Sequence, residues 1–505
     1  MNGKNKTKNT FIRLVICSVI CVFLTAAPAM AVYALPAEAR DVIHQLLDDA
    51  VRISGVPGIS VAVIYDNQTH FFNAGRTSRR NRDNPVSVNA QTLYEIGSLS
   101  KAFTAAGILL LEEQRLLSTA DYIADHLPWF YVMYQNEITD VTIKQLLNHT
   151  SGLTQTHSDA PRGEGTDMLR RTVEPFVGAR LDFLPGTAFS YGNANYNILG
   201  LIIETVSGQS YESFMQEQVF RPLGLYQTFA YRSDAIATGR MAQGHRHGFF
   251  MTFTFDAPVY GGMTPTGFII SSTLDMARWM GIHLGLVQDI PEIFIRVVER
   301  AHQADINGPD MSSGTFYTSG WVTNLDTNTL GHAGQTPNFS SNIRILPDEG
   351  QGVIFLTNGV NINFDLAWNI HAVLNGDLSQ SYTRGEEHRT DIRMSVIVIF
   401  LVATTVVELI AGIRNRLKFK PVLTKSKVIM TSFWTVIAVL AIGRILHYPT
   451  AVGSGWAYIF DWNPISVTAL LFIAPVFIAV TAWHTYTKNP TPDEAEVGPV
   501  NSAEH

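Results

Sequence analysis

Three long apolar stretches after residue 393 constrain this chain more than any other feature. They lie at 394–413, 428–446 and 465–484, and each has roughly the 20 residues that a helix needs to cross a bilayer. Because the bilayer core holds no water to satisfy backbone polar groups, such stretches must be helical. The sequence therefore predicts three transmembrane helices, followed by a tail at 485–505.

The orientation of these helices follows from one basic loop. RNRLKFKPVLTKSK, between the first two stretches, contains six Lys or Arg residues, and such loops stay in the cytoplasm. Residues before 394 and the loop 447–463 are then expected outside the plasma membrane, and the tail inside. Trp456, Tyr458 and Trp462 of the outer loop are expected at the membrane interface, where aromatic rings gather.

The N-terminus points to the same side of the membrane. MNGKNKTKNTFIR is basic, LVICSVICVFLTAA is apolar and short, and Ala29-Met30-Ala31 offers a small-x-small cleavage site. This layout predicts a secretory signal peptide over 1–34. The alternative is an uncleaved anchor, which would also export the domain that follows. Cys17 and Cys21 are the only cysteines, so that domain, predicted over 35–385, has no disulfide.

The predicted exported domain has strand patterns at both ends. GISVAVIYDNQTHFFNAG reads as two strands around an Asp-Asn turn, and GHAGQTPNFSSNIRILPDEGQGVIFLTNG reads as two or three more. Helical patterns lie between: SKAFTAAGILLLEEQ, TIKQLLNHTSG with Gly152 as its C-cap, and NANYNILGLIIETVSG. One sheet built from both ends of the domain, with an inserted helical lobe, is an α+β layout. The formal net charge of −7, without long charged runs, gives no reason to expect a nucleic-acid partner.

Ser98 and Lys101 form the first candidate site. Residues at i and i+3 share one face of a helix, so the lysine amine can reach the serine hydroxyl. A serine needs a base to become a nucleophile, and a lysine becomes one only when burial lowers its pKa. The apolar run AAGILLL that follows would provide that burial. Ser-x-x-Lys also arises by chance in a chain of this length.

Two further candidates follow along the chain. Tyr191-Gly192-Asn193 comes after a Pro-Gly turn, where a tyrosine is usually a packing residue. His332-Ala333-Gly334 opens a strand, where small residues let a ligand approach the backbone. Either of them alone has a structural explanation.

Taken together and in this order, the three motifs resemble the serine β-lactamase and penicillin-binding-protein superfamily, in particular its class C-like branch. LLNHTSGL, LPGTAFSYGNANYNILG, RPLGL and PTGFIISSTLDMARW add to the resemblance, which covers about 45–375. It implies a β-lactamase-like antiparallel sheet flanked by helices, with a helical lobe.

The resemblance also implies roles for individual residues. Ser98 is the acylated nucleophile, and Lys101 and Tyr191 share the proton transfers, with the acylation base left open between them. The backbone N–H groups of Ser98 and Gln335 form the oxyanion hole. Asn193 binds the substrate or Lys101.

The third motif departs from the superfamily's usual Lys-Thr-Gly. His332 and Gly334 would line the site, but a neutral histidine holds a substrate carboxylate less well than a lysine does. This argues against β-lactam hydrolysis. Histidine at this place is found among esterase-like and D-amino-acid peptidase relatives.

The exported domain with three C-terminal helices and the strand GQTPNFSS resembles the membrane-bound, D-asparagine-specific peptidases of nonribosomal peptide pathways, of the colibactin-maturing type. These remove an N-acyl-D-asparagine cap from an exported prodrug. Asn193, Asn338 and Ser340 would then bind the cap's carboxamide. The sequence departs from that type at Asn193, where those relatives carry Ser, and at Thr336, where a second Asn is expected.

This resemblance implies three partners: the capped prodrug as a small-molecule substrate, the lipid bilayer and the exporter that delivers the prodrug. No cofactor or metal is implied, and His245-Arg246-His247 is more simply a solvated turn than a metal site. His149 is expected to pack at a helix end. The alternatives are a D,D-carboxypeptidase, β-lactamase or esterase of the same superfamily, and a non-catalytic sensor.

Overall fold

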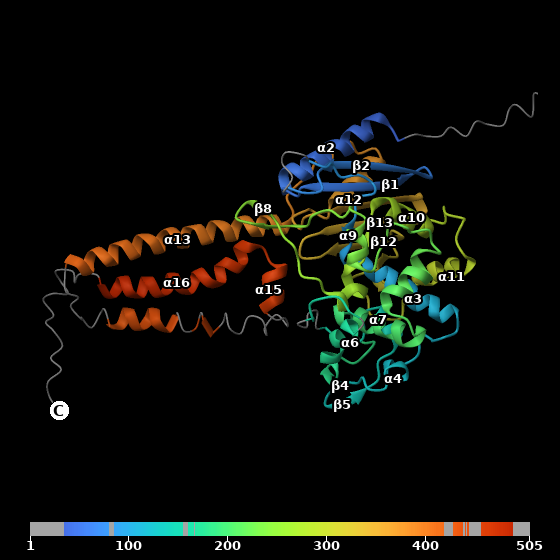
Figure 1. Cartoon of the computed structure of the whole chain (residues 1–505), viewed down its shortest axis with the longest axis horizontal. Coiled ribbons are helices and arrows are strands. Elements are labelled where there is room, and N and C mark those ends of the chain that lie inside the picture. The colour runs from blue at the N-terminus through green and yellow to red at the C-terminus, as the bar shows by residue number, and fades with distance from the viewer. Residues whose placement is uncertain are drawn as a thin grey trace, which may run out of the picture.

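A computed structural model describes residues 35–79, 85–154, 160–165, 167–418, 428–437, 440, 442–443 and 456–487. The predicted signal peptide at 1–34 lies outside the described residues, as does the tail beyond Thr487. Figure 1 shows a globular α+β body from which two long helices extend side by side.

A seven-stranded antiparallel sheet forms the centre of this body, in the order β10-β11-β12-β13-β14-β1-β2. Its strands are β1 (Gly58–Tyr65), β2 (Gln68–Gly75), β10 (Thr315–Thr318), β11 (Trp321–Asn324), β12 (Thr329–Gln335), β13 (Ser340–Leu346) and β14 (Gln351–Thr357). Strand β1 pairs with β14, which joins the two ends of the domain as the sequence predicts. Asp66 and Asn67, with φ of 48° and 59°, make the predicted turn between β1 and β2.

Helices cover both faces of the sheet. On one face, α2 (Ala37–Ser54) and α12 (Leu366–Leu374) pack their apolar residues on β1 and β14. On the other face lie α10 (Thr273–His283) and α3 (Ser100–Glu113). Strand β1 is buried over seven of its eight residues, as expected for a strand with helices on both sides.

The helical lobe lies between β2 and β10. Its helices are α4 (Ile123–His126), α5 (Ile143–Leu147), α6 (Met168–Val173), α7 (Asn193–Ser207), α8 (Tyr211–Phe214), α9 (Arg232–Ala237) and α11 (Glu292–Ala301). Short strands complete it: β3 (Tyr94–Glu95) with β9 (Ile270–Ser271), β4 (Val132–Tyr134) with β5 (Glu137–Thr139) and β6 (Ala179–Arg180), and β7 (His245–Gly248) with β8 (Met251–Thr254).

Two local expectations in this lobe are wrong. Helix α5 ends at Leu147, and His149 adopts a φ of 56°, so Gly152 is not its C-cap. The segment His245–His247 is strand β7 and not a solvated turn, because both histidines are buried and bind neighbouring groups. Among the described residues, no group of three or more His, Cys, Asp or Glu side chains is placed to hold a metal.

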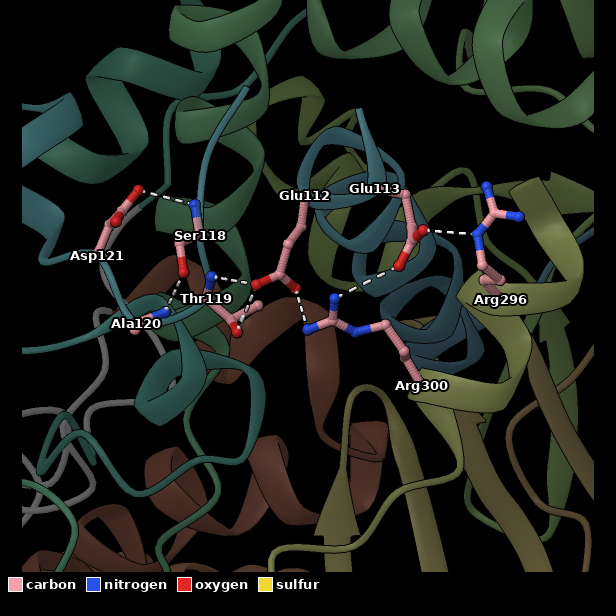
Figure 2. A network of polar contacts seen from close by, with 8 residues as sticks. All are labelled: Glu112, Glu113, Ser118, Thr119, Ala120, Asp121, Arg296 and Arg300. Atoms are coloured by element: carbon pink, nitrogen blue, oxygen red, sulfur yellow. Dashed lines mark hydrogen bonds and ion pairs between the residues drawn. The ribbon is translucent and has the colours of Figure 1, made fainter. Parts of the chain in front are cut away.

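A polar network holds the far end of α3 against α11 (Figure 2). Glu112 accepts hydrogen bonds from the Thr119 backbone and hydroxyl, at 2.8 and 2.9 Å, and pairs with Arg300 at 2.6 Å. Glu113 pairs with Arg296 at 2.8 Å and with Arg300 at 3.4 Å. Single exposed ion pairs contribute little, but a network that shares partners fixes an orientation. The helix that begins beside Ser98 is thereby fixed at its other end.

Two helices beyond the sheet are long and apolar enough to span a membrane, among the residues that the structure describes. They are α13 (Glu386–Lys418) and α16 (Ile465–Thr487), which contain the first and third predicted spans. Two of the three predicted membrane helices are therefore found among the described residues. Within 428–446 the apolar helix that the structure describes is Val428–Ile437, and most of the remainder of this stretch lies outside the described residues.

The short helix α15 (Trp456–Trp462) precedes α16 and lies against the lobe. Asp461 pairs with Arg162 at 2.8 Å and accepts a hydrogen bond from the Tyr260 hydroxyl. The Phe460 carbonyl accepts a hydrogen bond from Arg246 at 3.0 Å. The segment between the apolar helices therefore binds directly to the α+β body.

Candidate active site

Ser98 sits in a tight turn that packs against strand β12 of the sheet. It belongs to the 3₁₀ turn Gly97–Leu99, which continues into α3. Gly97 has a φ of 56°, and a Cβ there would lie 2.2 Å from the Gln335 backbone nitrogen. Only glycine tolerates both the conformation and the contact. The turn thus carries Ser98 next to Gln335 at the end of β12, where the predicted oxyanion hole needs both backbone N–H groups.

Lys101 lies on the first turn of α3 and is fully buried. Its Nζ is 3.1 Å from Ser98 Oγ, 2.9 Å from Asn193 Oδ1 and 2.7 Å from the Thr266 carbonyl oxygen. Burial lowers its pKa well below the usual range for lysine. A neutral amine has two N–H bonds and one lone pair. The two carbonyl oxygens can accept the N–H bonds, which leaves the lone pair for the Ser98 hydroxyl.

Tyr191 approaches Ser98 from the other side. Its hydroxyl lies 2.9 Å from Ser98 Oγ, and the Lys101 amine lies 4.9 Å from its ring centre. Burial raises the pKa of Tyr191 above its usual value, so the phenol keeps its proton. The structure therefore brings the three predicted catalytic side chains together around one oxygen atom.

His149 holds the segment that carries Tyr191. Its Nδ1 is 3.3 Å from the Gly192 backbone nitrogen and 3.0 Å from Asn195 Nδ2, both of which can donate. The His149 carbonyl accepts a hydrogen bond from Ser190 N at 3.0 Å, and its ring lies 4.4 Å from the Tyr191 ring. Burial lowers the pKa of His149 well below its ordinary value. His149 is buried just beyond the end of α5, as the sequence predicts, and its hydrogen bonds also position Tyr191.

His332 lines the cleft but is already engaged by two neighbours. Its Nδ1 is 2.6 Å from the Ala333 carbonyl oxygen, which can only accept. Its Nε2 is 3.0 Å from the Tyr317 hydroxyl, which therefore donates. Burial, with a smaller effect of Lys101, lowers the pKa of His332 to about 3. The imidazole is neutral and offers no positive charge to a substrate carboxylate.

A cleft of about 340 Å³ opens over Ser98. Ser98, Tyr191, Asn193, His332, Gly334 and Gln335 line it, together with Met263, Thr266, Gly267, Phe268, Ala333, Phe364 and Trp462. Two predicted substrate residues are not brought to it. Asn338 is buried, and its amide donates to the Phe255 carbonyl at 2.9 Å. Ser340 is buried where β13 begins.

Trp462 at the end of α15 forms one wall of this cleft. Its ring meets Phe268 edge-on, with centroids 6.4 Å apart. At the start of α13, the Glu387 side chain hydrogen-bonds the Gln335 side chain. The sequence pattern places Trp462 at the membrane interface, and nothing in that pattern reveals that the ring reaches the cleft.

Comparison with known proteins supports the resemblance to the β-lactamase and penicillin-binding-protein superfamily. The family model described as "Beta-lactamase" matches residues 42–376. The chain is 28% identical over 453 residues to Protein flp of Staphylococcus aureus (strain MW2), which covers 86% of this chain and 88% of that protein. It is 29% identical over 324 residues to Penicillin-binding protein 4 of Amycolatopsis lactamdurans, covering 62% of this chain and 83% of that one.

Solved structures show the same fold. An octameric penicillin-binding protein homologue from Pyrococcus abyssi superposes with a TM-score of 0.60 at 23% identity, covering 68% of this chain and 79% of that one. A class C β-lactamase superposes with a TM-score of 0.56 at 18% identity, covering 68% of this chain and 98% of that one.

We predict that His149→Phe lowers kcat about tenfold or more, because the Gly192 backbone loses its acceptor and Tyr191 shifts. KM should change much less. Steady-state kinetics of the folded full-length protein measure both. The control is His283→Phe, which removes another buried histidine, one that contacts His302. A wild-type kcat for a folded His149→Phe variant would contradict the positioning role.

We also predict a pH dependence of stability from Lys101. Its folded pKa is lowered, so between that pKa and about 10.4 the unfolded state binds one more proton. Stability therefore rises with pH across this window, by about 1.4 kcal/mol per pH unit from this residue. Lys101→Met should remove that slope, measured by thermal unfolding between about pH 8 and 10.

The control for this experiment is Lys144→Met, since Lys144 is half exposed and pairs with Asp305 at the surface. It should leave the slope unchanged. If Lys101→Met also leaves the slope unchanged, the lysine is protonated in the folded protein and the neutral-amine description is wrong.

Proposed function

Because the chain belongs to the β-lactamase family, we propose that it is a membrane-anchored serine hydrolase that removes an N-acyl-D-asparagine cap from an exported precursor. The observation that carries the hydrolase assignment is the convergence of Lys101 Nζ and the Tyr191 hydroxyl on Ser98 Oγ, at 3.1 and 2.9 Å. The substrate assignment rests on the chemistry of the cleft and on the sequence resemblance.

In the proposed mechanism, the Ser98 oxygen attacks the D-asparaginyl carbonyl carbon while its proton moves to the lone pair of Lys101. The backbone N–H groups of Ser98 and Gln335 stabilise the oxyanion. When the C–N bond breaks, Tyr191 gives its proton to the leaving amine nitrogen and regains one from Lys101. Water then hydrolyses the Ser98 ester and releases N-acyl-D-asparagine.

The state of His332 supports a substrate without a carboxylate at this wall. Cell-wall peptides and penicillins carry a carboxylate, which a cation would bind far better than a neutral ring does. His332 is neutral, and the Tyr317 hydroxyl and the Ala333 carbonyl occupy its two nitrogens. An amide-containing substrate that ends in a neutral group fits this wall better.

The apolar residues that line the cleft support an acyl chain. Met263, Phe268, Phe364 and Trp462 give the cleft an apolar side, where an acyl chain would leave water. Asn193, with its Oδ1 bound to Lys101, stands at the polar side. The side chains of Asn338 and Ser340 would act on the cap only after rearrangement, so Asn193 and the Gln335 side chain are the better candidates to bind the carboxamide.

The two apolar helices support attachment to the plasma membrane. We infer that α13 and α16 cross the bilayer with the catalytic body outside, since the basic run 414–427 of the sequence begins with Arg414 and Arg416 at the C-terminal end of α13. The apolar sequence of residues 428–446 supports a third crossing. A body placed in this way meets a precursor as an exporter delivers it.

A second candidate is a D,D-carboxypeptidase, β-lactamase or esterase that acts on cell-wall peptides or small esters. The names of the relatives favour it, since Penicillin-binding protein 4 of Amycolatopsis lactamdurans is among them. This candidate shares the Ser98 acyl-enzyme and differs only in substrate.

The test of the proposed function is mass spectrometry of an N-acyl-D-asparaginyl amide incubated with membranes that carry the full chain. We expect release of N-acyl-D-asparagine, its loss in Ser98→Ala, and no reaction of the L-asparaginyl isomer. If neither isomer is cleaved while a fluorescent penicillin labels Ser98, the second candidate is correct.

We predict that His332→Lys increases acylation of Ser98 by benzylpenicillin about tenfold or more, because a charge-assisted hydrogen bond to the penicillin carboxylate becomes available. The rate of labelling by a fluorescent penicillin measures this. The control is His332→Gln, which adds no charge. Equal labelling of the two variants would show that the charge at this position does not select the substrate.

A further inference from the structure

We propose that the tip of the β7–β8 hairpin, formed by Phe249, Phe250 and Met251, is a membrane-contacting element that inserts into the outer leaflet beside α13. The proposal rests on the inferred membrane crossing of α13 and α16. It adds a lipid contact made by the catalytic body itself.

The first observation is the composition of the turn. Gly248 pairs with Met251, so Phe249 and Phe250 form a two-residue hairpin loop, and both have positive φ, 51° and 64°. Such turns strongly favour Asn-Gly, because bulky side chains are strained in this conformation. Two phenylalanines therefore disfavour this turn, so a stabilising contact outside the hairpin must offset the backbone strain.

The second observation is the exposure of the tip. Phe250 is 51% exposed, Met251 is 56% exposed and Phe253 is 36% exposed. Three large apolar side chains on one short hairpin form an apolar surface that a water-facing loop does not need. An aromatic ring and a flexible thioether are suited to the boundary between lipid headgroups and acyl chains.

The third observation is the position of the tip along the axes of α13 and α16. The Phe250 backbone N–H donates to Asp391 of α13 at 3.3 Å, and Asp391 also accepts from Ser466 of α16 at 2.5 Å. A Cβ on Gly248 would lie 2.5 Å from the Ile465 side chain, so the hairpin packs closely on the start of α16. The tip is therefore fixed to both apolar helices at their outer ends.

The apolar surface of α13 begins at the same level. Val396 is 54% exposed and Phe400 is 67% exposed, and Val396 follows Asp391 by only about 7.5 Å along a helix. Figure 1 shows β8 beside the first part of α13, on the side of the body from which the long helices extend. This continuity with the helix surface identifies lipid, rather than a soluble partner, as the occupant.

The β4–β5 hairpin provides a matched control. Its Ile138 is 69% exposed, but β4 and β5 lie at the far end of the helical lobe, away from the outer ends of α13 and α16 (Figure 1). The exposed Ile138 side chain should therefore contact water and not lipid.

The experiment uses the full chain in phospholipid nanodiscs, with Cys17 and Cys21 replaced by serine. Single variants Phe250→Cys, Ile138→Cys and Phe400→Cys each carry an environment-sensitive nitrobenzoxadiazole label. Lipids spin-labelled near the headgroup quench a label that touches the outer leaflet. We expect blue-shifted emission and at least twofold quenching for Phe250→Cys and Phe400→Cys, and neither effect for Ile138→Cys.

If the Phe250→Cys label behaves like the Ile138→Cys label while Phe400→Cys is quenched, the hairpin proposal is wrong and the membrane crossing stands. If the Phe400→Cys label is not quenched either, the hairpin proposal and the inferred membrane crossing are both wrong. The double variant Phe249→Asn/Phe250→Gly, labelled at Met251→Cys, keeps the turn without the apolar tip, and its quenching should fall below that of Met251→Cys alone.

Discussion

The buried amine of Lys101 is the interaction on which the rest of the site depends. Burying an ammonium without a counter-charge is costly. The three hydrogen-bond partners of its Nζ are the Ser98 hydroxyl, the Asn193 amide oxygen and the Thr266 backbone carbonyl, none of which is a carboxylate. The fold resolves this by favouring the neutral amine, which is also the form that can accept the Ser98 proton. Desolvation by the apolar helix α3 thus keeps Lys101 in the neutral form that can act as the base, which makes this helix part of the catalytic apparatus.

The surroundings of Lys101 explain why the lobe and the sheet must meet here. The 3₁₀ turn Gly97–Leu99 supplies Ser98, and α3, which follows it, supplies Lys101. Helix α7 begins with Asn193, and the Thr264–Phe268 turn supplies the Thr266 carbonyl. His149 fixes the strand-like segment before α7, and β12 brings Gln335 and His332 from the end of the domain. Each of these groups comes from a different part of the chain, so the site exists only in the complete fold.

The helices beyond the catalytic body reach the site as well. Asp461 fixes α15 to Arg162 and Tyr260, which sets the Trp462 ring in the cleft wall. The Trp462 ring therefore links the shape of the cleft to the position of α15, which leads directly into α16.

The sequence predicts the architecture well, because the signals involved are local. Period-two and helical patterns give the sheet from both ends and the helices α3 and α7, and three motifs give Ser98, Lys101, Tyr191, Asn193, His332 and Gly334. At the site, the failures concern tertiary contacts. Asn338 lies in the turn between β12 and β13, where its amide donates to the Phe255 carbonyl. Neither His149 nor Trp462 carries a local pattern that reveals its contact with Tyr191 or the cleft.

The rate of Ser98 acylation as a function of pH, measured with a fluorophosphonate probe on the full-length protein, tests the central claim most directly. If Lys101 is neutral because it is buried, the rate is already at its plateau near neutral pH and falls only on acidification. A rate that still rises steeply up to about pH 10, where an ordinary lysine loses its proton, would contradict the account.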